Sequence, residues 1–343
     1  MGRGLRWLGW LLAAAGALAL AAGWWIDRWA GQPRAGSGET VLVDLHGIAD
    51  LDAAAERLAA AGLVDDADLF VLWARHLGPD GLELRPVELA LADDLSPAAV
   101  LAALQRAPAA RHPLRIAPGA RLDQVAAGFE AAGLAEAEAL LAGARDAALL
   151  ERFGIAAASL EGYLPAGEHR FARRTPVADI LARLVAAGRA TRPADWRRRA
   201  RRWRMSEHEL VTLASLIEAE SRTPAQLRPI AGVLRNRLRF DWTLASDASA
   251  RYAAWLATGA APAALGPADR AREHAYNTHI HKGLPPGPIG APSPAALAAA
   301  LRPERHQAMF HGCDADGRLW LCADWVCARR MRSGERGAAP DGP

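Results

Sequence analysis

One uncharged, almost wholly apolar run near the N-terminus constrains this chain more than any other feature. Residues Trp7 to Ile26 contain no acidic or basic side chain. A helix of about 20 residues rises about 30 Å, which matches the hydrocarbon core of a bilayer. Arg3 and Arg6 precede the run, and tryptophans gather near both of its ends, as they do at membrane interfaces. The sequence therefore predicts a cytoplasmic N-terminus over residues 1–6 and a transmembrane anchor over residues 7–26.

A cleaved signal peptide is the alternative interpretation of this segment. Ala19-Leu20-Ala21 resembles a cleavage site, but the apolar run continues beyond it through Trp24 and Trp25, which favours an anchor. Under both interpretations the rest of the chain lies outside the cytoplasm. That topology, together with a net charge of only +3, argues against a nucleic-acid partner.

The remaining residues predict an α+β protein with two compact parts, which a length of 343 residues can supply. After a linker over residues 27–39, the pattern predicts a strand, two helices, a second strand within Leu82–Leu91, and a helix capped by Ser96. This order, β-α-α-β-α, predicts a small α/β module over residues 40–106. Beyond it we expect a connecting region over 107–205, a second domain of helices and short strands over 206–330, and a disordered tail over 331–343.

The densest basic cluster of the chain is WRRRARRWR, residues 196–204. Such a cluster can bind anionic lipid headgroups or acidic peptides, but the solvated face of a helix is the interpretation we favour. Trp196 and Trp203 are seven residues apart and would share one helix face, which we expect to be buried.

A carboxylate on an otherwise apolar helix face is the most unusual feature of the second half. Ser206 and Glu209 form a capping box that predicts a helix over residues 210–222. Leu216 belongs to the apolar stripe of this helix, and Glu220, four residues later, continues the stripe. A buried carboxylate is unfavourable unless it is paired, protonated or functional. Burial and the negative end of the helix dipole both raise its pKa, as a general acid at neutral pH requires.

Two other interpretations of this carboxylate stay open. It can be neutralised by an ion pair with a nearby arginine, for which the sequence offers Arg222, Arg228 and Arg235. Glu218, which lies on a more lateral face of the same helix, is the alternative acid.

Several polar residues further along suit a substrate cleft. Asn236 lies between apolar positions of a helix, where its amide either turns toward a cleft or is simply exposed. Asp247 precedes a helix, and we favour an N-cap over a catalytic role there. Tyr276 and Asn277 precede a rigid loop, Gly283–Gly290, which contains three prolines and three glycines. We expect this loop to form one wall of a groove in which Tyr276 stacks on a sugar and Asn277 hydrogen-bonds to it.

The sequence predicts neither a metal site nor a cofactor. His274, His279 and His281 are close together, but no carboxylate or fourth ligand is spaced to complete a site. The cysteines fit no zinc pattern, and two of them can form a disulfide in an oxidising compartment, although the sequence does not choose the pair. They are Cys313, Cys322 and Cys327.

Four segments together resemble the MltG/YceG-like family of endolytic murein transglycosylases. They are TLASLIEAES (Thr212–Ser221), VLRNRL (Val233–Leu238), SDASARYA (Ser246–Ala253) and YNTHIHKGLPPGPIGAPSPAAL (Tyr276–Leu297). The similarity is specific from about Leu160 to Arg302 and weak before that.

The resemblance implies an N-terminal transmembrane helix, a small LysM-like module and a catalytic domain on the periplasmic side of the inner membrane. Carried over by position, Glu220 is the one essential acid, and Asn236, Asp247, Tyr276 and Asn277 are substrate-binding residues of the cleft. Members of this family cleave MurNAc–GlcNAc bonds within nascent glycan strands and leave 1,6-anhydro ends without a cofactor. The implied partners are peptidoglycan strands, the membrane and enzymes of cell-wall synthesis.

The chain also departs from the family pattern. Ala245 stands where the family usually has Gln, Ala248 where it has Pro, and Leu319 lies in a segment that usually carries His and Phe. These differences motivate one alternative, a catalytically impaired relative that binds glycan and scaffolds cell-wall synthesis. The other alternative is a hydrolase that uses Glu220 and Asp247 as a pair of carboxylates.

Overall fold

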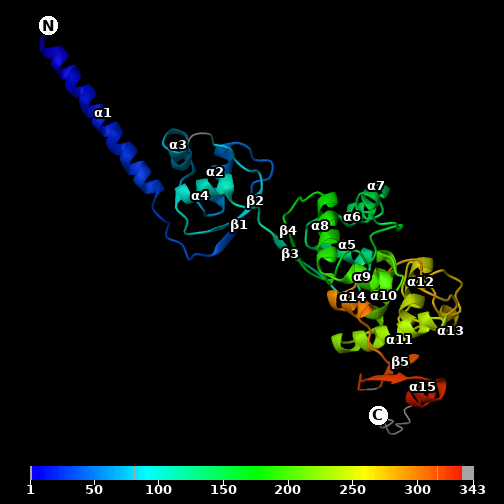
Figure 1. The fold of residues 1–343 in the computed structure, drawn as a ribbon. Helices are drawn as coiled ribbons and strands as arrows, with labels where there is room; N and C mark the ends of the chain where they lie inside the picture. The colour runs from blue at the N-terminus through cyan, green and yellow to red at the C-terminus, as the bar shows by residue number, and fades with distance from the viewer. Residues whose placement is uncertain (1, 80–81, 315, 334–343) are drawn as a thin grey trace. The chain divides into compact units, whose positions relative to one another are not determined.

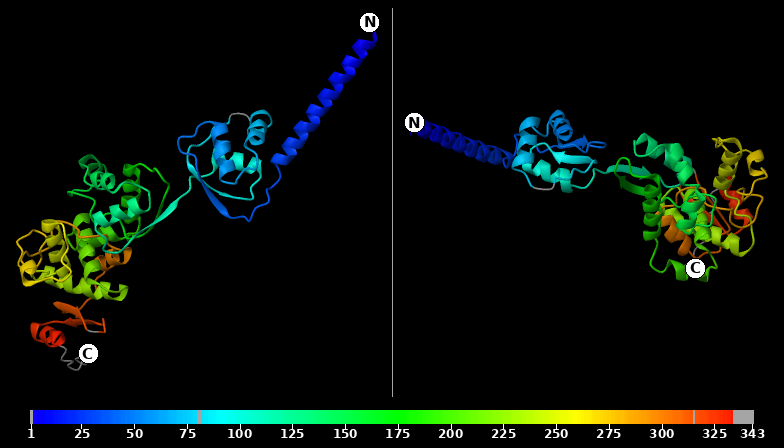
Figure 2. Two further views of the ribbon diagram at one scale, coloured as in Figure 1. Left: turned by 180° about the vertical axis from the view of Figure 1, so that it is seen from behind. Right: turned by 90° about the horizontal axis from the view of Figure 1, so that it is seen from above.

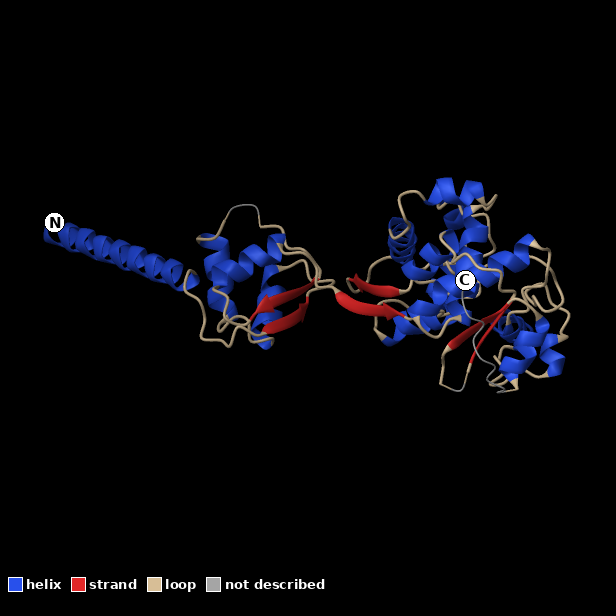
Figure 3. Ribbon diagram, turned by 60° about the horizontal axis from the view of Figure 1, so that its bottom comes forward, coloured by secondary structure: helices blue, strands red, loops and turns tan. Residues whose placement is uncertain are grey.

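The computed structural model describes residues 2–79, 82–314 and 316–333. The chain forms two compact units, residues 1–112 and 113–343, and each is described by itself (Figure 1). Within the described residues helices predominate, and the named strands form three two-stranded sheets (Figure 3). The predicted mixture of helices and strands is therefore confirmed.

The first unit opens with helix α1, Gly2–Ala30, which ends later than the predicted Ile26. Its segment Trp7–Ala30 is long and apolar enough to cross a membrane, judged by length and composition. Most side chains along this segment are exposed, and only its last turn is covered, where Trp29 and Ala30 pack against the core of the module that follows. The helix is compatible with a membrane anchor, because so much exposed apolar surface is unfavourable in water.

Five elements make up the small module. They are β1 (Thr40–Asp44), α2 (Leu51–Ala60), α3 (Ala67–His76), β2 (Glu88–Ala92) and α4 (Pro97–Arg106). β1 and β2 pair antiparallel, with Leu42 opposite Ala90. The side chains of Asp50, Asp66 and Ser96 accept hydrogen bonds from first-turn amides and so begin the three helices. The order of the elements is the predicted one, although the second strand begins at Glu88.

The segment between α1 and β1 is bound to the module rather than free. The guanidinium of Arg34 pairs with Asp65, and the carboxylate of Asp93 accepts hydrogen bonds from the backbone amides of Ser37 and Gly38 at 3.1 and 2.7 Å. A linker held in this way adds little freedom to the chain.

The second unit contains one large hydrophobic core. Its first half comprises β3 (His112–Ile116), α5 (Leu122–Ala131), α6 (Ala137–Gly143), α7 (Ala147–Arg152), β4 (Gly167–Phe171), α8 (Val177–Ala190) and α9 (Trp196–Arg202). Its second half comprises α10 (Glu207–Glu220), η1 (Pro224–Gln226), α11 (Leu227–Arg239), α12 (Asp247–Thr258), α13 (Pro267–Arg270), α14 (Pro294–Leu301), β5 (Phe310–Cys313), β6 (Leu319–Cys322) and α15 (Trp325–Arg332). The core runs from Leu114 to Leu301, so the predicted connecting region shares its interior with the domain predicted after it.

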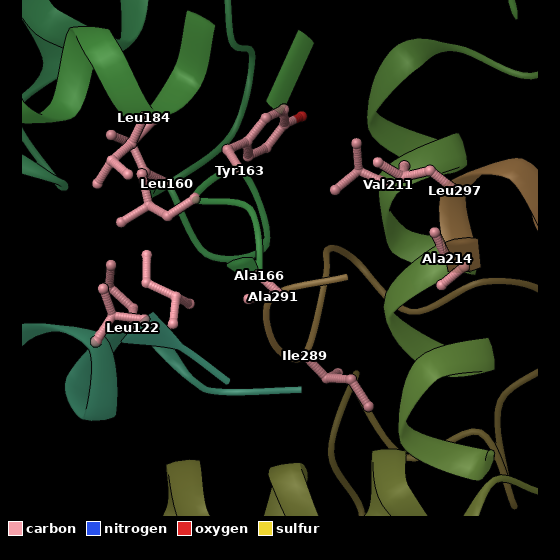
Figure 4. Close-up of a cluster of buried hydrophobic side chains, with 14 of the residues drawn as sticks. Leu122, Leu160, Tyr163, Ala166, Leu184, Val211, Ala214, Ile289, Ala291 and Leu297 are labelled. Carbon is pink, nitrogen blue, oxygen red and sulfur yellow. The ribbon is translucent and has the colours of Figure 1, made fainter. Parts of the chain in front are cut away.

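Helix α10 lies within this core. Every residue from Leu210 to Ile217 is buried, including the polar Thr212 and Ser215, so this stretch is covered on all sides and not only along the predicted apolar stripe. Figure 4 shows Val211 and Ala214 of α10 beside Leu297 of α14. Ser206 and Glu209 form the predicted capping box. α10 is surrounded by protein along this stretch and emerges from the core at both ends, in its first turn at Glu209 and in its last turn from Glu218.

The arginine-rich segment forms α9 but does not bury both of its tryptophans. Trp196 is half-buried, with the Arg192 guanidinium 4.9 Å from its ring centre. α9 ends at Arg202, and Trp203 lies beyond it, 39% exposed, beneath the guanidinium of Arg235. The predicted buried face is therefore wrong, because the helix is too short to carry both rings.

The C-terminal residues form a hairpin and a helix, coloured orange to red in Figures 1 and 2. β5 and β6 pair antiparallel, and α15 packs on them around a small core of its own. A disulfide joins Cys322 to Cys327, whereas Cys313 is not bridged. Because α15 extends to Arg332, the predicted tail cannot begin at residue 331; residues 334–343 lie outside the described residues.

Candidate active site

Glu220 is the last residue of α10 and lines a groove of about 840 Å³. α10 ends here because Ser221 has extended backbone angles, and its hydroxyl donates back to the carbonyl of Ile217. Oε1 of Glu220 accepts hydrogen bonds from the hydroxyl of Ser246 and from the amide of Ala248, the latter at 3.4 Å. Among the described residues nothing donates a hydrogen bond to Oε2, so this oxygen is left for a ligand.

Charged and aromatic side chains together line the groove. Its lining residues are Glu220, Arg222, Arg237, Ala245, Asp247, Arg270, His279, Phe310, His311, Gly312, Cys313, Trp320, Trp325 and Arg332. Concave sites with aromatic walls and a few convergent polar groups are typical of ligand binding.

The surroundings of Glu220 favour its protonated form. Burial is the main cause of the raised pKa, and the nearby carboxylate of Asp247 raises the pKa further. The hydrogen bonds from Ser246 and Ala248 and the charge of Arg237 oppose this rise without cancelling it. The first residues of α12 thus bind the carboxyl group, because a helix N-terminus stabilises negative charge.

Glu218 has a partner of its own, and among the described residues the three arginines suggested by the sequence do not pair with Glu220. Glu218, two residues before Glu220, accepts a hydrogen bond at 2.8 Å from the amide of Ser293, which is the N-cap residue of α14. Within the described residues, Arg222, Arg228 and Arg235 make no ion pair with Glu220. Of the two acidic residues at this end of α10, only Glu220 lines the groove.

Asp247 lies in the same groove but in a different electrostatic state. It is the first residue of α12, and Ser246 rather than Asp247 is the N-cap, so the cap interpretation is wrong. The Arg270 guanidinium donates to both oxygens of Asp247 at 2.9 and 2.8 Å, and His279 Nε2 lies 2.9 Å from Oδ1. Arg270, and secondly His279, hold the pKa of Asp247 below its usual range, so it remains a carboxylate.

Asn236 and Asn277 do not line the groove, because their amides bind backbone carbonyls. Asn236 Nδ2 donates to the carbonyls of His306 and Ala308, both at 2.9 Å. Asn277 is fully buried, and its Nδ2 donates to three carbonyls between residues 269 and 272. Asn277 Oδ1 also accepts from the amide of His279. The Asn277 amide therefore holds the backbone that carries Arg270, the partner of Asp247, whereas the Asn236 amide holds the chain before β5.

Tyr276 and the proline-rich loop also lie away from the groove. The ring of Tyr276 packs 5.0 Å from that of Tyr252. The loop predicted as a groove wall enters the core, where the amide of Ile289 donates to the hydroxyl of Ser215. A Cβ on Gly290 would meet backbone at 2.5 Å, so the loop packs tightly inside the unit.

Several groove residues were not expected from the sequence. Arg237 is buried, and its guanidinium donates to the carbonyls of Met309 and Leu244. A cation on the inner face of α11 was a detectable signal, of the same kind as Glu220 on α10. His311 comes from β5, and burial, aided by two arginines, lowers its pKa to about 4, so it is neutral. Nothing in the local sequence marked the aromatic wall of β5, β6 and α15.

The histidines that lie close together in the sequence pair with different carboxylates. His279 pairs with Asp247, and His281 with Glu273. Among residues 2–79, 82–314 and 316–333 no group of three His, Cys, Asp or Glu side chains is arranged to hold a metal ion.

A sequence model of the YceG-like family matches residues 43–319, which is most of the chain. The chain belongs to this family. The match ends before Trp320, so part of the groove wall lies beyond the matched residues.

Curated relatives match shorter segments. The endolytic murein transglycosylase of Bacillus subtilis (strain 168) is 33% identical over 116 residues, 34% of this chain and 31% of that protein. The endolytic murein transglycosylase of Streptococcus pneumoniae serotype 2 is 26% identical over 163 residues, 47% of this chain and 29% of that protein. The matches thus span about a third of these relatives' own length. A crystal structure described as a yceG-like protein from Listeria monocytogenes shares the fold, with a TM-score of 0.57 and 22% identity over 86% of this chain and 100% of that chain.

Proposed function

We propose that this chain is a membrane-anchored endolytic transglycosylase that cuts MurNAc–GlcNAc bonds within peptidoglycan strands. The observation that carries the proposal is the carboxyl group of Glu220, which is half-buried, has a raised pKa and leaves one oxygen available in a groove. The names of the curated relatives supply the substrate class. In this proposal α1 lies in the inner membrane, and both units act on its periplasmic side.

Glu220 serves first as an acid. Its proton passes to the glycosidic oxygen of the departing GlcNAc as the bond from that oxygen to C1 of MurNAc breaks. Ser246 and the N-terminus of α12 hold Oε1, so the proton is carried by Oε2. The same contacts stabilise the carboxylate that forms when the proton leaves.

Glu220 then serves as a base. Its carboxylate takes the proton of the C6 hydroxyl of MurNAc, and O6 bonds to C1 to close a 1,6-anhydro ring. One bond has broken and one has formed, the proton has returned to Glu220, and neither water nor a cofactor enters the balance.

The other site residues suggested by the sequence have supporting roles in this proposal. Asp247 is the substrate-binding residue within the groove, and Asn277 positions the backbone that carries its partners Arg270 and His279. We propose that Asn236 holds the chain before β5, while Tyr276 packs beside Tyr252. The β-α-α-β order of the small module supports a LysM-like glycan-binding role for residues 40–106.

A hydrolase is the second candidate, and one observation favours it. Glu220 and Asp247 line one groove with pKa values shifted in opposite directions, which is how paired carboxylates divide acid and base roles. A hydrolase would leave reducing MurNAc ends, because water would attack C1 in place of O6.

Mass analysis of glycan ends tests both candidates. The purified full-length chain in detergent is incubated with peptidoglycan, and we expect 1,6-anhydro ends. Glu220→Gln should lower the rate by about 10³-fold or more, while Glu218→Gln, the matched control two residues away, should stay within about threefold. Reducing ends that also vanish in Asp247→Asn would establish the hydrolase. A folded chain that binds strands but makes no ends of either kind would be the impaired scaffold.

A further inference from the structure

The part of the groove beyond the family match carries an unexplained tryptophan. Trp325 lines the groove on α15, and 55% of its surface is exposed. Its ring lies 5.7 Å from that of Phe310, which also lines the groove, and the Arg332 guanidinium lies 5.4 Å from its centre. A large exposed aromatic surface inside a concave site is unfavourable in water and usually marks a contact with a ligand.

The backbone at Trp325 is fixed on both sides. The disulfide between Cys322 and Cys327 closes a short ring of chain around this residue. Asp324 caps α15, because its carboxylate accepts a hydrogen bond from the amide of Cys327 at 2.9 Å. A fixed aromatic ring loses little conformational entropy when a ligand covers it, so the cross-link prepares the ring for binding.

We propose that Trp325 is a sugar-stacking subsite of the groove and that the Cys322–Cys327 disulfide holds it in place. Its ligand is a ring of an N-acetylhexosamine strand, and this choice of ligand rests on the proposed function. Arg332 beside the ring binds the carboxylate of an acidic peptide stem, since a guanidinium matches carboxylate geometry. The subsite therefore prefers strands that carry their stems over bare glycan.

Binding to an inactive parent tests the subsite without cleavage. The parent is full-length Glu220→Gln in detergent, titrated by calorimetry with soluble stem-bearing strands and with stem-free strands. Trp325→Ala is expected to raise the Kd for both by about tenfold, and Trp325→Phe by about threefold. Trp203→Ala, which removes an exposed tryptophan outside the groove, is the matched control and should stay within twofold. Arg332→Ala should raise the Kd about threefold for stem-bearing strands only.

A separate experiment tests whether the Cys322–Cys327 disulfide holds Trp325 in place. Replacing both Cys322 and Cys327 by Ser should raise the Kd about threefold, and a reductant should do the same to the parent but not to the serine variant. An unchanged Kd in Trp325→Ala, with its unfolding temperature preserved, overturns the subsite. An unchanged Kd in the serine variant overturns the proposed role of the disulfide. If Trp325→Ala weakens binding but the wild-type chain cuts nothing, cleavage alone fails; if the chain cuts and Trp325→Ala binds normally, the subsite alone fails.

Discussion

Two glutamates of the second unit, Glu220 and Glu161, have raised pKa values for the same main reason, yet their surroundings suit different tasks. Burial raises the pKa of Glu161 to about 7 and is also the largest cause of the rise at Glu220. Each carboxyl group lies at a helix N-terminus: Glu220 at α12, and Glu161 at α5, where the amide of Leu122 donates to both of its oxygens at 3.1 and 3.2 Å.

The two carboxyl groups differ in whether one oxygen is without a hydrogen bond from the described residues. Oε2 of Glu161 also accepts a hydrogen bond from the hydroxyl of Tyr252 at 3.2 Å, and the side chain lines none of the described pockets. Glu220 has one engaged oxygen and a groove beside the other. Burial and a raised pKa are therefore shared by a structural carboxyl group and a candidate acid, and access to a ligand separates them.

The first way to break this comparison is to remove each acid in turn. Glu220→Gln should reduce the rate of strand cleavage by about 10³-fold or more, a loss of about 4 kcal/mol of transition-state stabilisation. Glu161→Gln keeps an oxygen that can accept from Leu122, so its rate per folded molecule should stay within about threefold. Initial rates normalised to folded protein measure both. Equal losses in the two variants would mean that Glu161, too, takes part in the chemistry.

The second prediction concerns pH and stability. The folded-state pKa of Glu161, about 7, lies above its ordinary 4.5, so the folded state binds the extra proton between these values. Its contribution to stability is full below about pH 4.5 and is lost as the pH rises through 7, at most about 3 kcal/mol in total. Urea unfolding of the second unit from pH 4.5 to 7.5 should show a smaller decline in Glu161→Gln than in the wild-type chain. Parallel declines would show that Glu161 is not protonated in the folded state.

Local patterns in the sequence predicted what depends on helix periodicity. The capping box at Ser206, the order of elements in the small module and the anomaly at Glu220 all follow from neighbours within a few residues. The hydrogen bonds of the Glu220 carboxyl group do not follow from such neighbours, because Ser246 and Ala248 lie at the N-terminus of α12, more than twenty residues further along the chain.

The misassigned residues show a second limit. The side-chain amide of Asn277 binds three backbone carbonyls. The sequence alone does not distinguish such an amide from one that binds a sugar. We expected Trp203 on the same helix face as Trp196, but α9 ends at Arg202, one residue before Trp203. The aromatic wall around Trp325 arises from a hairpin far from Glu220 in sequence, and no local pattern reports such contacts.

The third prediction sharpens the comparison at the engaged oxygen. The hydroxyl of Ser246 lowers the pKa of Glu220, so Ser246→Ala should raise it and move the alkaline limb of kcat/KM to higher pH. Lost positioning should also reduce the rate about fivefold to tenfold near neutral pH. Ser246 is the N-cap of α12, so Ser96→Ala, which removes the cap of α4, controls for cap loss and should leave the profile unmoved. If the alkaline limb of kcat/KM does not shift, the Ser246 hydroxyl does not affect the pKa of the group that titrates there.

The smallest effect is expected at Ala248, where the resemblance to the family implies Pro. The amide of Ala248 donates to Glu220 at 3.4 Å, and a proline at this position would have no N–H to donate. Proline is tolerated in the first helical turn, and Ala248→Pro should therefore fold while removing one contact that lowers the pKa of Glu220. The alkaline limb should move in the same direction as in Ser246→Ala but less far, with a rate change within about threefold. A shift toward lower pH would mean that this amide does not stabilise the carboxylate, and the engaged oxygen would then depend on Ser246 alone.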